Sequence, residues 1–172
     1  MKVLTAFTGL AGLAGFVGLV GFLACPGAAA AGPVDVKMVQ PERFADVGWR
    51  LADRERNLEL IRQHFESLGA RLPAGQALAV EILDIDLAGE ELPGPHSAER
   101  WRVLTGRADW PRMRLRYTLS VPGQPARSME EWLADLAYLQ RVPRAGDHPL
   151  PYEARMIDEW FAQRILQGEP AR

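Results

Sequence analysis

Residues 112 to 120 constrain the fold most, because apolar and polar side chains alternate there without interruption. The apolar positions are Met113, Leu115, Tyr117 and Leu119. The polar positions are Arg112, Arg114, Arg116, Thr118 and Ser120. Since strand side chains point alternately to two faces, this pattern predicts a β-strand with one buried face and one face in solvent. Such a strand requires a sheet that is covered on one side only.

Three further elements are predicted in or near the first half of the chain. Residues 34–39 alternate in the same way and predict a strand. A helix is expected from Asp53, as its N-cap, to Leu68, with Gly69 ending it. Its apolar stripe comprises Leu58, Ile61, Phe65 and Leu68. Residues 78–87 predict another strand, whose apolar phase changes at Leu83. That change indicates either a bulge or a strand buried on both faces.

The second half of the chain completes the predicted fold. Residues 88–99 are expected to form a loop, and residues 101–107 and 126–133 to form strands, although Glu130 and Glu131 leave a helix open for the latter. A helix is predicted from Pro151 to about Gly168. The order strand, helix, four strands, helix predicts an α+β fold. We expect a mostly antiparallel sheet of about four to five strands with two main helices packed on one face.

The N-terminal segment is predicted to direct export. Residues 3–24 carry no charge, Lys2 precedes them, and residues 28–31 are all alanine, which suits a signal peptide of residues 1–31 cleaved after Ala30 or Ala31. Two alternatives remain open. Residues 22–25 resemble an imperfect lipobox, which would place cleavage before a lipidated Cys25, and an uncleaved segment would be a membrane anchor. Residues 32–172 are then expected to form a single domain with an ordered core of about 34–166.

Composition agrees with a periplasmic or other cell-envelope location. Cys25 is the only cysteine, so the predicted domain holds no disulfide in an oxidising compartment. After Lys2 is removed with the leader, 19 basic and 22 acidic residues remain. This balance does not predict the clustered basic surface that nucleic acids require. Membrane contact is expected only through the N-terminal segment or a lipid on Cys25.

Charged residues on the predicted strands are the candidate ligand-binding groups: Asp84, Asp86, Arg112, Arg114 and Arg116. The aspartates, with Glu90, Glu91 and His96 downstream, could offer oxygen ligands to a metal, but a bare D-x-D pair does not define a metal site. The arginines could bind anions. We expect instead that the acidic and basic rows face each other across one sheet face, with Glu81 or Arg102 joining them.

Other side chains that carry chemistry give weaker indications. Trp49, Trp101 and Trp110 lie near predicted loops and could form a binding surface, whereas Trp160 lies on the helical stripe and is expected in the core. His64 lies off its helix stripe and is expected to be exposed. No nucleotide-binding, metalloprotease or nucleophile-elbow motif occurs, so no catalytic residue and no cofactor are predicted.

Several stretches together resemble a family of secreted bacterial proteins known only as a domain of unknown function, number three-thousand-and-sixteen. The resemblance runs from about Val34 to Arg164 and rests on residues 41–47, 83–90, 110–112, 115–117, 135–138 and 152–161. It implies export and a single domain, and it implies no activity, ligand or site residue.

Three functions are therefore weighed. The first is an uncharacterised exported envelope protein that acts as a non-catalytic binding or interaction module for an envelope protein or small ligand. The second is a small-anion or ligand carrier that uses the arginine-rich strand. The third is a metal-dependent enzyme centred on Asp84 and Asp86.

Overall fold

The alternating segment at residues 112–120 forms an inner strand of the sheet, and its strand conformation agrees with the sequence prediction. Strand β5 (Arg112–Ser120) buries Met113, Leu115, Tyr117 and Leu119 and turns its arginines outward. The computed structural model describes residues 32–95, 99–141 and 148–168. The predictions made for the leader, Cys25 and His96 lie outside these residues.

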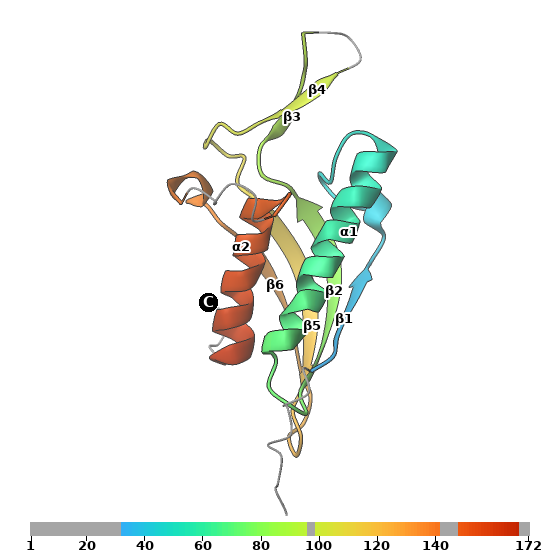
Figure 1. Cartoon of the computed structure of the whole chain (residues 1–172), viewed down its shortest axis with the longest axis vertical. Helices are drawn as coiled ribbons and strands as arrows, with labels where there is room; N and C mark the ends of the chain where they lie inside the picture. Colours follow the sequence, from blue (N-terminus) through green and yellow to red (C-terminus); the bar gives the residue numbers. More distant parts are fainter. Residues whose placement is uncertain (1–31, 96–98, 142–147, 169–172) are drawn as a thin grey trace, which may run out of the picture.

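The main sheet has four strands in the order β1-β2-β5-β6. Strand β1 (Val34–Met38) runs parallel to β2 (Ala77–Asp86), whereas β5 is antiparallel to both β2 and β6 (Arg127–Ala134). Helix α1 (Leu51–Ser67) and helix α2 (Pro151–Trp160), which continues as the π-helical turn η4 (Phe161–Leu166), lie over the same face of the sheet (Figure 1). The α+β prediction is confirmed, and the segment predicted as a strand at residues 126–133, for which a helix was left open, is strand β6.

Three short 3-10 turns lie between these elements: η1 (Pro41–Arg43), η2 (Leu68–Arg71) and η3 (Tyr138–Gln140). Within the described ranges, no helix combines the length and the apolar character needed to cross a bilayer.

The core lies between the two helices and the inner face of the sheet. Ile61 and Phe65 of α1 and Ile157 and Phe161 of the second helix are almost completely buried. Trp160 makes edge-to-face contacts with Phe65 and Tyr117, at centroid distances of 5.9 and 5.4 Å. The prediction that Trp160 belongs to the core is confirmed.

The phase change in β2 is a bulge. The register between β2 and β5 shifts between Ile82 and Asp84, which inserts Leu83 as an extra residue. Ile82 and Ile85 therefore both face the core, while Asp84 and Asp86 stay on the outer face. The bulge allows β2 to keep one continuous apolar face despite its broken alternation.

Four local predictions are wrong. The strand expected over residues 101–107 ends at Val103. Helix α1 begins at Leu51 after Arg50 and not after Asp53, which lies in the first turn where the helix dipole favours a carboxylate. Residues 88–99 are not all loop, because Glu90–Pro93 forms strand β3, which pairs with β4 (Arg100–Val103) in a separate two-stranded sheet. His64 is mostly buried, and its Nε2 lies 3.1 Å from the Ala154 carbonyl oxygen.

The β3–β4 hairpin projects beyond the end of the main sheet (Figure 1). It leaves the sheet through Gly89, whose φ of +81° is a conformation that favours glycine. A Cβ at this position would lie 2.6 Å from the Val103 carbonyl oxygen, so the two hairpin arms approach too closely for a side chain. Gly89 thus fixes where the hairpin leaves the sheet.

Candidate functional site

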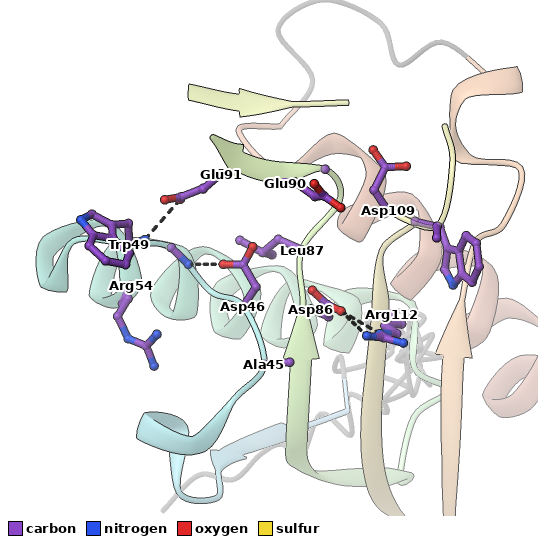
Figure 2. A pocket seen from close by; sticks show the side chains of 14 residues that line it. Ala45, Asp46, Trp49, Arg54, Asp86, Leu87, Glu90, Glu91, Asp109 and Arg112 are labelled. Carbon is purple, nitrogen blue, oxygen red and sulfur yellow. Dashed lines mark hydrogen bonds and ion pairs between the residues drawn. The ribbon is translucent and has the colours of Figure 1, made fainter. Parts of the chain in front are cut away.

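A polar cleft of about 620 Å³ lies where β2 ends and the β3–β4 hairpin begins. We call it the β2-end cleft. Its lining residues come from four segments of the chain: Ala45, Asp46, Gly48, Trp49, Arg54, Asp86, Leu87, Gly89, Glu90, Glu91, Ala108, Asp109, Trp110 and Arg112. Figure 2 shows Trp49 and Arg54 toward one side, Asp109 and Arg112 toward the other, and Asp46 and Asp86 between them.

The first wall is the segment that connects η1 to α1. Phe44 and Val47 are buried and hold this segment against the core. Asp46 then pairs with Asp86 in an isolated parallel bridge, with its N–H donating to the Ile85 carbonyl at 3.0 Å and its carbonyl accepting from Leu87 N–H at 3.1 Å. Trp49, three residues further on, is brought to the rim of the cleft with 66% of its surface exposed.

The second wall is the hairpin, which Arg102 of β4 holds in place. Its guanidinium donates to both carboxylate oxygens of Asp46, at 2.9 and 3.1 Å, and to Glu91 Oε1 at 3.1 Å. It also donates to the carbonyl oxygens of Ala88 and Gly89. Burial alone would lower the pKa of Arg102, but these carboxylates raise it above its ordinary value.

The third wall is formed by residues 108–112 at the start of β5. Arg112 Nε donates to Asp86 Oδ2 at 2.7 Å, and this pair is drawn in Figure 2. Asp109 is buried, and its Oδ2 accepts from the Thr105 N–H at 2.6 Å and from the Thr105 hydroxyl at 3.0 Å. Burial would raise the pKa of Asp109, but hydrogen bonding by Thr105 and Tyr138 outweighs burial, and the pKa is lowered.

The residues predicted from the charge pattern are brought together only in part. Asp86 pairs with Arg112, as the facing-row hypothesis expects, and Glu81 joins by accepting from Arg116 at 2.9 Å. Arg114 is opposite Asp84 in register, but its side chain donates to Glu130 of β6. Asp84 instead accepts from the Ala45 N–H at 2.8 Å. Asp84 and Arg114 thus face each other in register without forming an ion pair, because each side chain is bonded to another partner.

These contacts concern the two alternatives that rest on charge, namely the anion carrier that uses the arginine-rich strand and the metal-dependent enzyme centred on Asp84 and Asp86. Each outward arginine of β5 already lies against a carboxylate, and Arg116 contacts both Glu81 and Glu130. An incoming anion would have to compete with these carboxylates for the arginine side chains. Asp84 and Asp86 are similarly engaged, and in the described part of the chain no three histidine, cysteine or acidic side chains converge on a point that could hold a metal ion.

The sequence pattern did not predict the β2-end cleft. Of the residues singled out by sequence, Asp86, Arg112, Trp49 and Trp110 line the cleft, whereas Trp101 does not. The sequence did not place Asp46, Arg54 and Arg102 together. They come from positions far apart in the chain, so no local spacing connects them. The one local indication was Gly89 between two charged segments, which is typical of a sharp change of direction.

The fold and the cleft define an α+β domain with one helix-covered sheet face, one charged open face and a polar cleft at the sheet end. Residues 32–163 match the family described as protein of unknown function (DUF3016), and the chain belongs to that family. No curated protein matches the chain.

Proposed function

We propose that this chain is an exported cell-envelope protein whose domain is a non-catalytic binding module, with the β2-end cleft as its ligand site. The observation that carries the proposal is the cleft itself. About 620 Å³ is the size of a pocket for a small ligand or a short peptide segment. It is built from four segments, held by buried anchors and fixed hydrogen bonds, and left open to solvent.

The chemistry of the lining supports binding more than catalysis. Asp46, Asp86 and Glu91 are held in ion pairs with arginines, so none of them is a free acid or base. Asp109 is held through its Oδ2 by Thr105, while its buried Oδ1 has no hydrogen-bond partner among the described residues. The lining also includes Trp49 and Trp110, and tryptophan combines a large apolar surface with a hydrogen-bond donor, which suits recognition of sugars and peptides.

The proposal that the protein is exported rests on the leader pattern of residues 1–31. Mass spectrometry of the protein purified from its host tests it. An N-terminus at Ala31 or Gly32 would mean a free periplasmic protein, an acylated Cys25 would mean a lipoprotein, and a full-length mass in the membrane fraction would mean an anchor. Intact chain in the cytosol would contradict export.

The proposal of a ligand site is tested by titrating the isotope-labelled protein with short peptides and glycan fragments while recording amide spectra. Binding at the cleft should move the amide signals of Gly48, Gly89 and Glu90 and leave those of the outer sheet face unchanged. Shifts confined to the outer face, at the arginines of β5, would contradict this site and favour the anion-carrier alternative.

A further inference from the structure

The outer edge of β6 carries main-chain groups that do not bond to β5. Strand β6 is the last strand of the main sheet, and β5 is its only partner strand in the described part of the chain. The Asp135 N–H donates to the carbonyl oxygen of Pro111, which lies opposite it in the same register. In an antiparallel ladder such bonded residues alternate with residues that point away. The residues of β6 whose N–H and carbonyl groups point away from β5 are therefore Ser128, Glu130, Trp132 and Ala134.

This edge lacks the features that usually keep a sheet from pairing further. Within residues 32–95, 99–141 and 148–168, no backbone or side-chain group bonds to the four outward peptide groups. Proteins often protect an edge strand with a proline, a lysine or a bulge. The eight residues of β6 include neither proline nor lysine, and their register with β5 has no shift. The opposite edge, β1, has five residues and an exposed lysine, Lys37. Strand β6 is thus the edge that can accept another strand.

A hollow lies beside this edge, between β6 and the second helix. Helix α2 and η4 lie next to β6, on the side of the sheet away from β1 (Figure 1). Residues 131–135 form one wall of the hollow, and the helix supplies Met156, Glu159, Trp160, Gln163 and Arg164. Its volume is about 190 Å³, below the roughly 300 Å³ at which ordinary ligand pockets begin. An added strand would direct alternate side chains toward such a hollow, which is how sites of strand addition select their peptides.

The charges of the hollow are already balanced within the protein. Each of its three acids is paired with an arginine: Glu131 with Arg164, Asp135 with Arg155, and Glu159 with Arg141. A charged ligand would have to break one of these pairs. The apolar side chains of the hollow are Leu133, Met156 and Trp160, which belong to the core, and Trp132 is 58% exposed on the other face of β6. The surroundings of the edge therefore suit an uncharged segment with apolar side chains.

We infer that the outer edge of β6 binds an uncharged, extended peptide segment of another protein as a fifth strand of the main sheet, with alternate apolar side chains directed into the hollow beside α2. The helix favours a peptide over a second copy of this chain. Antiparallel pairing of two β6 edges keeps both helix-covered faces on one side, so both α2 helices would meet over the junction. A single strand needs only about 4.8 Å of width. This site shares no lining residue with the β2-end cleft and is independent of it.

The test titrates the isotope-labelled protein with acetyl-Thr-Leu-Thr-Leu-Thr-amide, an uncharged peptide with alternate apolar side chains. Two further forms of the peptide are N-methylated, one at the third residue and one at the fourth. Neighbouring amides of a strand point to opposite sides, so only one of the two methyl groups would lie against β6. The variant Ala134→Pro removes an outward N–H, a change that an edge strand tolerates. Ser128→Pro is the matched control, because it makes the same change outside the hollow.

The unmodified peptide should slow hydrogen exchange at the three outward amides beside the hollow, those of Glu130, Trp132 and Ala134. The amides between them already bond to β5 and should change little. One methylated peptide should bind about tenfold more weakly than the other, because it loses a main-chain hydrogen bond and leaves an acceptor unpaired. Ala134→Pro should weaken binding of the unmodified peptide by about tenfold, for the same reason, and Ser128→Pro should leave it unchanged.

Absence of binding by the unmodified peptide, or equal affinity of the two methylated forms, would overturn the inference, because the main chain of the edge would then not carry binding. Slowed exchange confined to Gly48 and Gly89 of the β2-end cleft would do the same. If a proline variant does not fold, the methylated peptides decide the outcome on the native protein. Sedimentation without peptide tests the other occupant: a dimer that Ala134→Pro dissociates would show that a second copy covers the edge, and would overturn the inference.

Discussion

Arg102 connects three parts of the molecule that are distant in sequence. It lies on β4, and its guanidinium reaches Asp46 before α1, Glu91 on β3 and the backbone at the end of β2. Only 24% of its side chain is exposed, so these bonds are shielded from water more than surface ion pairs are. One residue therefore holds the hairpin against the sheet and keeps the wall of the cleft in place.

Replacing Arg102 with alanine should lower the free energy of unfolding by about 2–4 kcal/mol, because Asp46 and Glu91 would lose their shared cation. Urea unfolding measures the loss, and hydrogen exchange should show faster exchange in β3 and β4 than in β5. Arg107→Ala is the control, since Arg107 is an exposed arginine of the turn after β4. An equal loss in both variants would contradict the anchoring role of Arg102.

Glu153, in the first turn of α2, is a buried acid outside the cleft. Its Oε1 accepts from the Ala88 N–H at 2.7 Å, and burial raises its pKa above the ordinary 4.5. The folded protein thus binds this proton more tightly than the unfolded chain does. The contribution of Glu153 to stability is greatest below pH 4.5 and decreases as the pH rises through the folded-state pKa.

Glu153→Gln keeps an oxygen that can accept from Ala88 and removes the buried charge. At pH 7.5 the variant should be more stable than the native protein by about 1–3 kcal/mol, and the difference should shrink as the pH falls toward 4.5. Chemical unfolding at several pH values measures this. A constant difference across that range would mean that Glu153 does not titrate as described.

At the scale of elements, the outer face of the sheet is a network of charges that joins three strands. Arg116 contacts Glu81 on β2 and Glu130 on β6, and Arg114 contacts Glu130 from the neighbouring position. The arginine side chains are about half exposed, so each pair contributes little by itself. The network favours one register of β5 against its neighbours, because a shift by one residue would bury the arginines.

Arg114→Glu should lower the unfolding free energy by about 0.5–1 kcal/mol, because it replaces a cation bonded to Glu130 with an acid that lies diagonally across from Glu130. Adding Glu130→Arg should restore part of the loss. Adding Asp84→Arg instead should increase it, because Asp84 accepts from the Ala45 N–H. Melting curves of the single and double variants measure these changes. Rescue by Asp84→Arg would show that the side chain at position 114 interacts with β2 and not with β6, and would contradict this prediction.

Gly89 sets the path of the hairpin. Gly89→Ala should be destabilising by about 2–4 kcal/mol, since a Cβ there combines a φ of +81° with a 2.6 Å approach to the Val103 carbonyl oxygen. Gly123→Ala is the matched control, with a φ of +74° but nothing within 4 Å of the added carbon. The Gly123→Ala variant measures the cost of the positive φ alone. Equal losses of stability in the two variants, measured by thermal unfolding, would show that the close approach to the Val103 carbonyl oxygen costs nothing.

The elements of the main sheet could be predicted because each has a local pattern. Strand β5 alternates without a break, and the α1 stripe of Ile61 and Phe65 has helical spacing. Strand β3 could not be predicted, because Glu90 and Glu91 are adjacent acids followed by Pro93. Its strand conformation comes from pairing with β4 and not from burial of one face.

At the scale of the molecule, one core connects most of the described chain. The cluster of buried apolar side chains extends in sequence from Phe44 to Ile165 and includes both helices and three of the four strands of the main sheet. Strand β1 adds Val34 and Val36 against the edge of this cluster. The cleft could not be predicted from the sequence, because its walls come together only when the whole core has formed.

A chain that starts at Gly32 should therefore fold without the leader and unfold in one cooperative transition, seen at the same temperature by far-ultraviolet circular dichroism and by tryptophan fluorescence. A chain that starts at Pro41 should melt at a lower temperature, because it lacks β1 and exposes the edge of β2. Separate transitions for the two probes in the longer chain would contradict a single cooperative unit.

Strand β1 runs parallel to β2, so both strands start at the same end of the domain. Gly32 lies against Gln76 at the start of β2, and the cleft lies past its far end. Ten residues of strand separate these two points by about 30 Å. If the protein is held at a membrane through its amino-terminal segment, the domain can stand with Glu90 and the hairpin directed away from the lipid, toward partners in the surrounding compartment.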